Sequence, residues 1–74
     1  MIFEKIRNVI VSQLGIEESE VKLETSFEEL GVDSLDLFQI IIELEEEFSI
    51  QIEDAESIKT VEDAVKYVEA RVEQ

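Results

Sequence analysis

The chain is organised around the sequence Gly31-Val32-Asp33-Ser34-Leu35-Asp36. Gly31 is typical of the end of a loop, and Asp33 predicts a helix N-cap, because its carboxylate can accept from the exposed N–H groups of a first turn. Asp36 falls at the third helical position, as a weaker capping-box partner. Ser34 is therefore predicted to be the first residue of a helix. Unpaired N–H groups and the helix dipole favour negative charge there, so the position suits a phosphate on the Ser34 oxygen.

The helix predicted from Ser34 to Phe48 has two apolar arcs. At about 100° per residue, the first arc has the spacing of a core stripe and consists of Leu37, Ile40, Ile41, Leu44 and Phe48. Beside it, a second arc consists of Leu35, Phe38 and Ile42. Two interpretations of the second arc stay open. Either a neighbouring loop covers it, or it forms an exposed apolar ridge, rimmed by carboxylates, that docks into another protein's groove.

Apolar spacing and capping residues also predict the structure of the segments on either side of this helix. Helical spacing of apolar residues predicts a helix over residues 2–14, which Gly15 would end. Residues 16–33 are predicted to form a long loop pinned by apolar side chains, with a short helical turn across residues 27–30 favoured by overlapping capping boxes. Residues 49–53 alternate in polarity and predict an extended connector whose Ile50 and Ile52 enter the core.

The C-terminal segments are also predicted to be helical. Residues 54–58 favour a single helical turn, and Thr60-Val61-Glu62-Asp63 is a capping box for a last helix over residues 61–73. Val61, Ala64, Val65, Val68 and Val72 are predicted to share one face of this helix. The predicted fold is all-α: a small four-helix bundle with three long helices, a short third helix and a long ordered loop between the first two.

Composition limits the class of protein. Seventy-four residues, 45% hydrophobic, with two Gly and no Pro, predict one folded domain over residues 1–74. The absence of Cys excludes disulfides and cysteine-based zinc sites, and we expect no metal site. The apolar runs are too short for a membrane span, and we find no signal peptide or lipidation motif.

Charge is concentrated around Ser34. The net charge is −14, and between Lys22 and Lys59 there are twelve acidic residues and no basic one. Such a surface repels phosphates, so direct nucleic-acid binding is not expected. A solvated acidic surface that only keeps the protein soluble is one interpretation. The asymmetry favours the other, docking on basic surfaces of partner proteins.

Two further blocks accompany the central motif. They are Leu44-Glu45-Glu46-Glu47-Phe48 and Ile58-Lys59-Thr60-Val61-Glu62-Asp63-Ala64. With their spacing and the acidity and length of the chain, these blocks give it an end-to-end resemblance to acyl carrier proteins. The resemblance implies a monomeric, cytoplasmic, non-enzymatic carrier. Its serine, here Ser34, would receive 4′-phosphopantetheine from coenzyme A, and the thiol of that arm would carry fatty acyl thioesters to the enzymes of fatty acid synthesis.

The residues agree with this implication. The chain contains no Cys, so a thiol must be imported, and no His, so Ser34 has no imidazole base and must be activated by a phosphopantetheinyl transferase. By the same resemblance, the helix from Ser34 recognises basic docking surfaces of partners through Asp33, Leu35, Asp36, Phe38, Ile42, Glu43 and Glu46. The residues expected to line a shelter for the acyl chain are Ile40, Leu44, Ile52, Ile58 and Val65.

Alternatives remain at this point. The chain could carry aminoacyl or polyketide units, or it could be a non-carrier acidic bundle that binds basic proteins. A serine hydrolase is disfavoured because Ser34 is not in a nucleophile elbow and no His completes a triad. A calcium sensor is disfavoured because the acids around Asp33 lack the alternating ligand pattern and its glycine.

Overall fold

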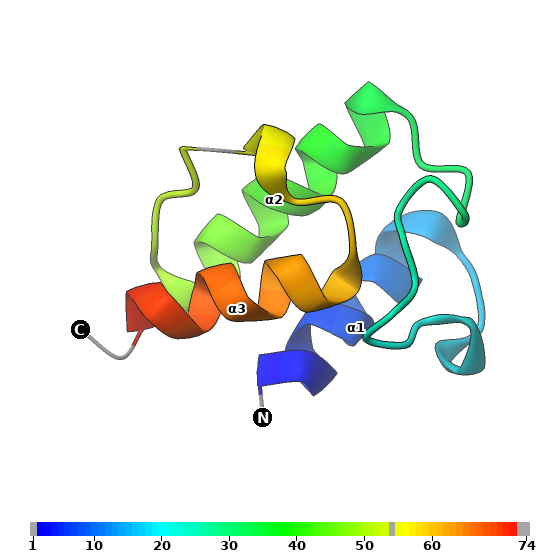
Figure 1. The fold of residues 1–74 in the computed structure, drawn as a ribbon, viewed down its shortest axis with the longest axis horizontal. Helices are drawn as coiled ribbons and strands as arrows, with labels where there is room; N and C mark the ends of the chain where they lie inside the picture. The colour runs from blue at the N-terminus through cyan, green and yellow to red at the C-terminus, as the bar shows by residue number, and fades with distance from the viewer. Residues whose placement is uncertain (1, 54, 73–74) are drawn as a thin grey trace.

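The computed structural model describes residues 2–53 and 55–72. Within them it contains three α-helices, α1 (Ile2–Leu14), α2 (Ser34–Phe48) and α3 (Val61–Val72), and two 3₁₀ helices, η1 (Glu18–Glu20) and η2 (Ala55–Ser57). Figure 1 shows the chain passing from α1 through a long loop to α2 and returning by way of η2 to α3. The predicted all-α fold is confirmed, and its short third helix is the single 3₁₀ turn η2. Residues 54 and 73, at the ends of two predicted elements, lie outside the described residues.

α1 has the bounds that its apolar spacing predicted. Ile6 and Ile10 are fully buried, one turn apart on the face toward the other helices. The helix ends at Gly15, whose φ of 66° is left-handed and whose N–H donates to the Val11 carbonyl at 2.8 Å. Glycine adopts this conformation without a steric penalty, which explains the stop.

The loop between α1 and α2 is held onto the bundle by buried side chains and backbone hydrogen bonds. Val21 and Phe27 are buried, and the Phe27 N–H donates to the Lys59 carbonyl at 2.9 Å. Ser26 and Glu29 exchange the two hydrogen bonds of a capping box, at 3.0 and 3.1 Å. The predicted turn across residues 27–30 is present as hydrogen-bonded turns rather than as a helix.

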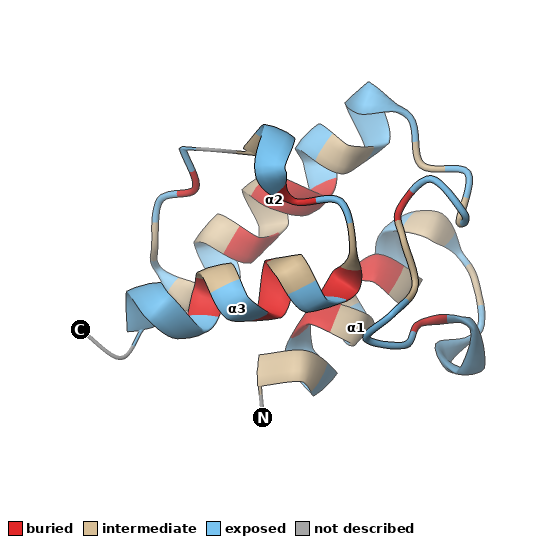
Figure 2. Cartoon of the chain, viewed as in Figure 1, coloured by how far each residue is buried: buried red, intermediate tan, exposed pale blue. Residues whose placement is uncertain are grey.

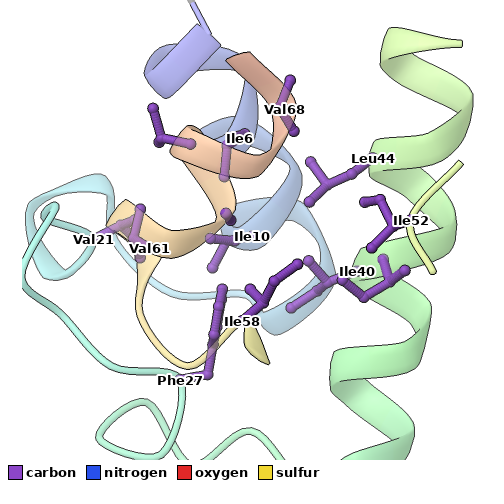
Figure 3. Close-up of a cluster of buried hydrophobic side chains, with 13 residues drawn as sticks. Ile6, Ile10, Val21, Phe27, Ile40, Leu44, Ile52, Ile58, Val61 and Val68 are labelled. Carbon is purple, nitrogen blue, oxygen red and sulfur yellow. The ribbon is translucent and has the colours of Figure 1, made fainter. Parts of the chain in front are cut away.

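α1 packs against both α2 and α3, whereas the described residues of α2 and α3 make few direct contacts with each other. Buried side chains from all three helices, the long loop and the segment around η2 form one cluster, which Figure 3 shows between the helices. Figure 2 marks the buried positions along the chain. In α2, Ile40, Ile41 and Leu44 are buried, as the first arc predicted.

The predicted apolar face of α3 is buried through Val68 and becomes exposed at Val72. Val61, Ala64, Val65 and Val68 are buried, but Val72 is 39% exposed. Figure 2 shows the last turn of α3 coloured as exposed. Helical periodicity places Val72 on the right face but does not say how far the core extends.

A connector follows α2 without regular secondary structure, as predicted. Ser49 ends α2 in a left-handed conformation with a φ of 54°. Ile52 is buried and Ile50 is half-buried, so both side chains contact the core. None of the helices in the described ranges is long and apolar enough to cross a bilayer.

Candidate functional site

Ser34 is the first residue of α2 and is exposed. Asp33 is the N-cap, since its Oδ1 accepts from the Asp36 N–H at 2.9 Å. Within the described chain, no reciprocal bond runs from the Asp36 carboxylate to Asp33, and no protein acceptor takes the N–H groups of Ser34 or Leu35. The start of α2 therefore offers two backbone donors and the positive end of the helix dipole beside the Ser34 hydroxyl.

The second apolar arc of α2 is exposed at its start. Leu35 is 77% exposed and Phe38 is 60% exposed, while Ile42 is half-buried. A neighbouring loop covers neither Leu35 nor Phe38, so the interpretation that a loop covers this arc is wrong for these two residues. Exposed large apolar side chains beside one another are the usual composition of a protein-docking surface. We call Leu35, Phe38 and Ile42 the α2 ridge.

The acids predicted to surround the ridge are at the surface. Asp33, Asp36 and Glu46 are exposed, and Glu43 is half-buried at the groove between α1 and α2. In residues 2–53 and 55–72, the one ion pair joins Arg7 and Glu18 at 3.7 Å, far in sequence from α2. The same residues contain no group of three or more acids that could hold a metal ion. Within the described chain, therefore, no basic side chain forms an ion pair with the acids of α2.

A shallow apolar hollow adjoins Ser34. It has a volume of about 320 Å³ and is lined by Ser34, Leu37, Phe38, Ala55 and Glu56. A second hollow of about 390 Å³ shares Leu37, Ala55 and Glu56 and continues toward Phe27 and Ile58. The sequence did not single out Ala55 and Glu56, because η2 approaches the start of α2 only through the folding of the chain.

The five residues expected to shelter an acyl chain all belong to the core. Ile40 and Leu44 are fully buried, and Ile52, Ile58 and Val65 are at most 9% exposed. Only Ile58 also lines one of the two hollows. The structure thus brings the five together in one buried cluster, and none of them lines the hollow beside Ser34.

A family model described as "Phosphopantetheine attachment site" matches residues 4–68. The acyl carrier protein of Lactococcus lactis subsp. cremoris (strain MG1363) is 57% identical over 68 residues, which cover 92% of this chain and 93% of that relative. The acyl carrier protein of Streptococcus thermophilus (strain CNRZ 1066) is 54% identical over 70 residues, 95% of both chains. The chain belongs to the acyl carrier protein family.

Family membership confirms the resemblance found in the sequence. As an acyl carrier protein, the chain is a non-catalytic carrier whose covalent cofactor is phosphopantetheine. The described residues provide for such a group at the start of α2, where a hydroxyl, free amide donors and an apolar hollow lie together. The family match alone does not say which residue bears the cofactor. The exposure of Ser34 and its position at the start of α2 make it the candidate attachment residue.

Proposed function

We propose that Ser34 bears the 4′-phosphopantetheine arm and that residues 1–74 form one carrier domain for fatty acyl thioesters in the cytoplasm. One observation supports this most directly: Ser34 is exposed as the first residue of α2, with unpartnered amide donors beside it. Attachment converts the serine hydroxyl into a phosphodiester, and the released leaving group is the nucleotide part of coenzyme A. The negative phosphodiester then lies at the positive end of the helix.

Partner recognition is proposed for the exposed side of α2. The ridge would enter an apolar groove, while the surrounding acids would meet Lys and Arg at the rim of a phosphopantetheinyl transferase or a fatty acid synthesis enzyme. The proposed contact residues are Asp33, Leu35, Asp36, Phe38, Ile42, Glu43 and Glu46. Five of the seven are exposed, Ile42 and Glu43 are half-buried, and within the described residues none of the acids among them forms an ion pair, which supports the proposal.

The acyl chain is proposed to enter the core cluster of Ile40, Leu44, Ile52, Ile58 and Val65. The apolar hollow beside Ser34 would hold the arm close to this cluster. An interior at native packing density has no free space for a chain, so side chains must move. Loading an eight-carbon chain should therefore shift the methyl NMR signals of these five residues, and unchanged signals would exclude them as the lining.

Intact-mass measurement tests the attachment site. After incubation with coenzyme A and a phosphopantetheinyl transferase, the protein should gain one arm, and Ser34→Ala should gain none. Ser12→Ala is the matched control, because Ser12 is an exposed serine on α1 and its removal should leave the reaction intact. Loading of Ser34→Ala would contradict the assignment. A protein that takes no arm at all would instead support a bundle that only binds basic partners.

A further inference from the structure

Side chains from α2 and α3 hold the connector, residues 49–53, by its backbone. The Glu45 Oε2 accepts from the Ile52 N–H at 2.8 Å, in a partly buried bond. The Tyr67 hydroxyl accepts from the Glu53 N–H at 3.1 Å. The Glu45 carbonyl oxygen also accepts from the Ile50 N–H at 3.1 Å. One residue of α2 thus binds the connector at two points, through its backbone and through its side chain.

The connector leads from the end of α2 toward η2 and carries Ile52 into the core. Described residues of α2 and α3 make few direct contacts, and Ile52 projects from the connector into the cluster. Figure 3 shows Ile52 beside Leu44 and Ile40, both fully buried. A side chain on a short connector is easier to displace than one on a packed helix, because fewer contacts and hydrogen bonds fix its backbone.

Glu45 differs from the other acids near the end of α2. It is half-buried and accepts from a backbone amide seven residues away. Glu46 and Glu47 are exposed, and within the described residues neither carboxylate accepts a hydrogen bond. A general role in surface charge would not require the carboxylate of Glu45 to face the connector. Its position is explained by satisfying the Ile52 N–H, which would otherwise lack a partner.

We propose that Glu45 is a positioning residue whose hydrogen bond to the Ile52 N–H holds Ile52 in the core and so restrains entry of the attached acyl chain. Tyr67 is the second anchor, through Glu53. The inference rests on the proposed function, which places the arm on Ser34 and the acyl chain in the core. Ile52 packs beside Leu44 in the cluster, so a chain that reaches Leu44 would displace Ile52 and draw the connector outward. Weakening the Glu45 bond therefore favours the state that admits the chain.

The first test uses the unmodified protein and does not depend on the carrier function. In Glu45→Ala, hydrogen exchange at the Ile52 amide should accelerate roughly tenfold, since a charge-assisted hydrogen bond is lost. Glu45→Gln keeps an oxygen acceptor and should restore most of the protection. Glu47→Ala makes the same change of charge two residues farther along α2 and should leave the Ile52 exchange unchanged. Unchanged Ile52 exchange in a folded Glu45→Ala protein would overturn the proposal.

The second test follows the acyl chain. Hydroxylamine cleaves exposed thioesters, so an octanoyl thioester that withdraws into the core should be cleaved more slowly than an acetyl thioester. Glu45→Ala should slow octanoyl cleavage several-fold further and leave acetyl cleavage unchanged, with Glu45→Gln close to the wild type. Equal octanoyl rates in the wild type and Glu45→Ala would overturn the inference alone. Failure to load Ser34, or equal octanoyl and acetyl rates in the wild type, would count against the proposed function.

Discussion

α2 begins with one side-chain hydrogen bond, from the Asp36 N–H to Asp33, whereas three such bonds surround the start of α3. There, Asp63 Oδ2 accepts from the N–H groups of Lys59 and Thr60 at 3.1 and 3.2 Å, and Thr60 Oγ1 accepts from the Asp63 N–H at 3.1 Å. The two helices use the same kind of cap. They differ in how many backbone N–H groups of the first helical turn remain without an acceptor in the protein once the cap is formed.

The first amides of α3 are used inside the protein. The N–H groups of Val61 and Glu62 donate to carbonyls of Thr25 and Leu23, both at 2.9 Å, and tie α3 to the long loop. Val61 is fully buried, while Ser34 at the equivalent place in α2 is exposed. The start of α3 therefore contributes to stability, and the start of α2 keeps its donors and apolar side chains for other molecules. Substitutions at the two starts should affect different measurements.

The largest effect after loss of Ser34 should come from the α2 ridge. Leu35→Ala and Phe38→Ala should each lower kcat/KM of the phosphopantetheinyl transferase by about tenfold or more, as expected for exposed apolar anchors of an interface. The free energy of unfolding should stay within about 0.5 kcal/mol of the wild type, because these side chains are already in water. Steady-state kinetics and urea denaturation measure the two quantities.

Leu23→Ala is the matched control for the ridge. Leu23 is 42% exposed and lies in the long loop rather than on α2. The Leu23→Ala substitution should leave kcat/KM of the transferase unchanged. A ridge variant with a lower free energy of unfolding but an unchanged transferase kcat/KM would show that Leu35 and Phe38 stabilise the fold and do not bind the transferase. The starts of α2 and α3 would then have the same role.

The next effect should be on stability, at the start of α3. Asp63→Ala removes the acceptor of two hydrogen bonds and should lower the free energy of unfolding by about 1–2 kcal/mol. For a domain of this size, each kcal/mol corresponds to roughly 4–8 °C in Tm. Modification at Ser34 should proceed at the normal rate. Glu69→Ala, an exposed charge on the same helix, controls for the removal of one negative charge.

A smaller loss of stability is expected at the start of α2. Asp33→Ala removes one hydrogen bond to an exposed turn and should cost about 0.5–1 kcal/mol, measured by urea denaturation. The same change should reduce transferase efficiency, because Asp33 is one of the proposed contact residues. A destabilisation as large as that of Asp63→Ala would show that both starts are equally structural.

Local patterns predicted most of the fold. The bounds of α1 and α2, the Asp33 cap and the capping box at Thr60 depend on neighbouring residues, and all are present. η1 was missed: its capping box pairs Glu17 with Glu20, and a glutamate at the N-cap is not a usual sign of a helix start. The exposed fraction of Val72 also depends on where neighbouring elements end, which its own spacing does not contain.

In the candidate site too, some features follow from adjacent residues and others depend on residues far along the chain. Ser34 and its helix position follow from the adjacent sequence, but the exposure of Leu35 and Phe38 depends on the path of the chain after α2. The hollow beside Ser34 requires Ala55 and Glu56, which lie about twenty residues farther along the chain. Likewise, the sequence gives Glu45 the pattern of an ordinary surface acid. Its bond to Ile52 arises only because the chain reverses direction after Ser49.

The smallest effect should be in the pH dependence of stability. The pKa of Asp63 is lowered from its ordinary value of 3.8, first by the hydrogen bond from the Lys59 N–H; partial burial opposes this shift, and bonds from Thr60 reinforce it. A carboxyl with a lower pKa in the folded than in the unfolded chain binds fewer protons when folded. Its stabilisation is therefore complete above the unfolded pKa and is lost as the pH falls through the folded one.

Asp63→Asn removes this titration. Its free energy of unfolding should be lower than that of the wild type at neutral pH, and the difference should shrink as the pH falls below about 4, because protonated Asp63 also loses its charge-assisted bonds. Urea denaturation at a series of pH values measures the difference, with Glu69→Gln as the control for one lost charge. A difference that stays constant down to the lowest pH would mean that the Asp63 carboxylate stabilises α3 no more than a neutral amide acceptor, and the contrast between the two helix starts would then rest on backbone bonds alone.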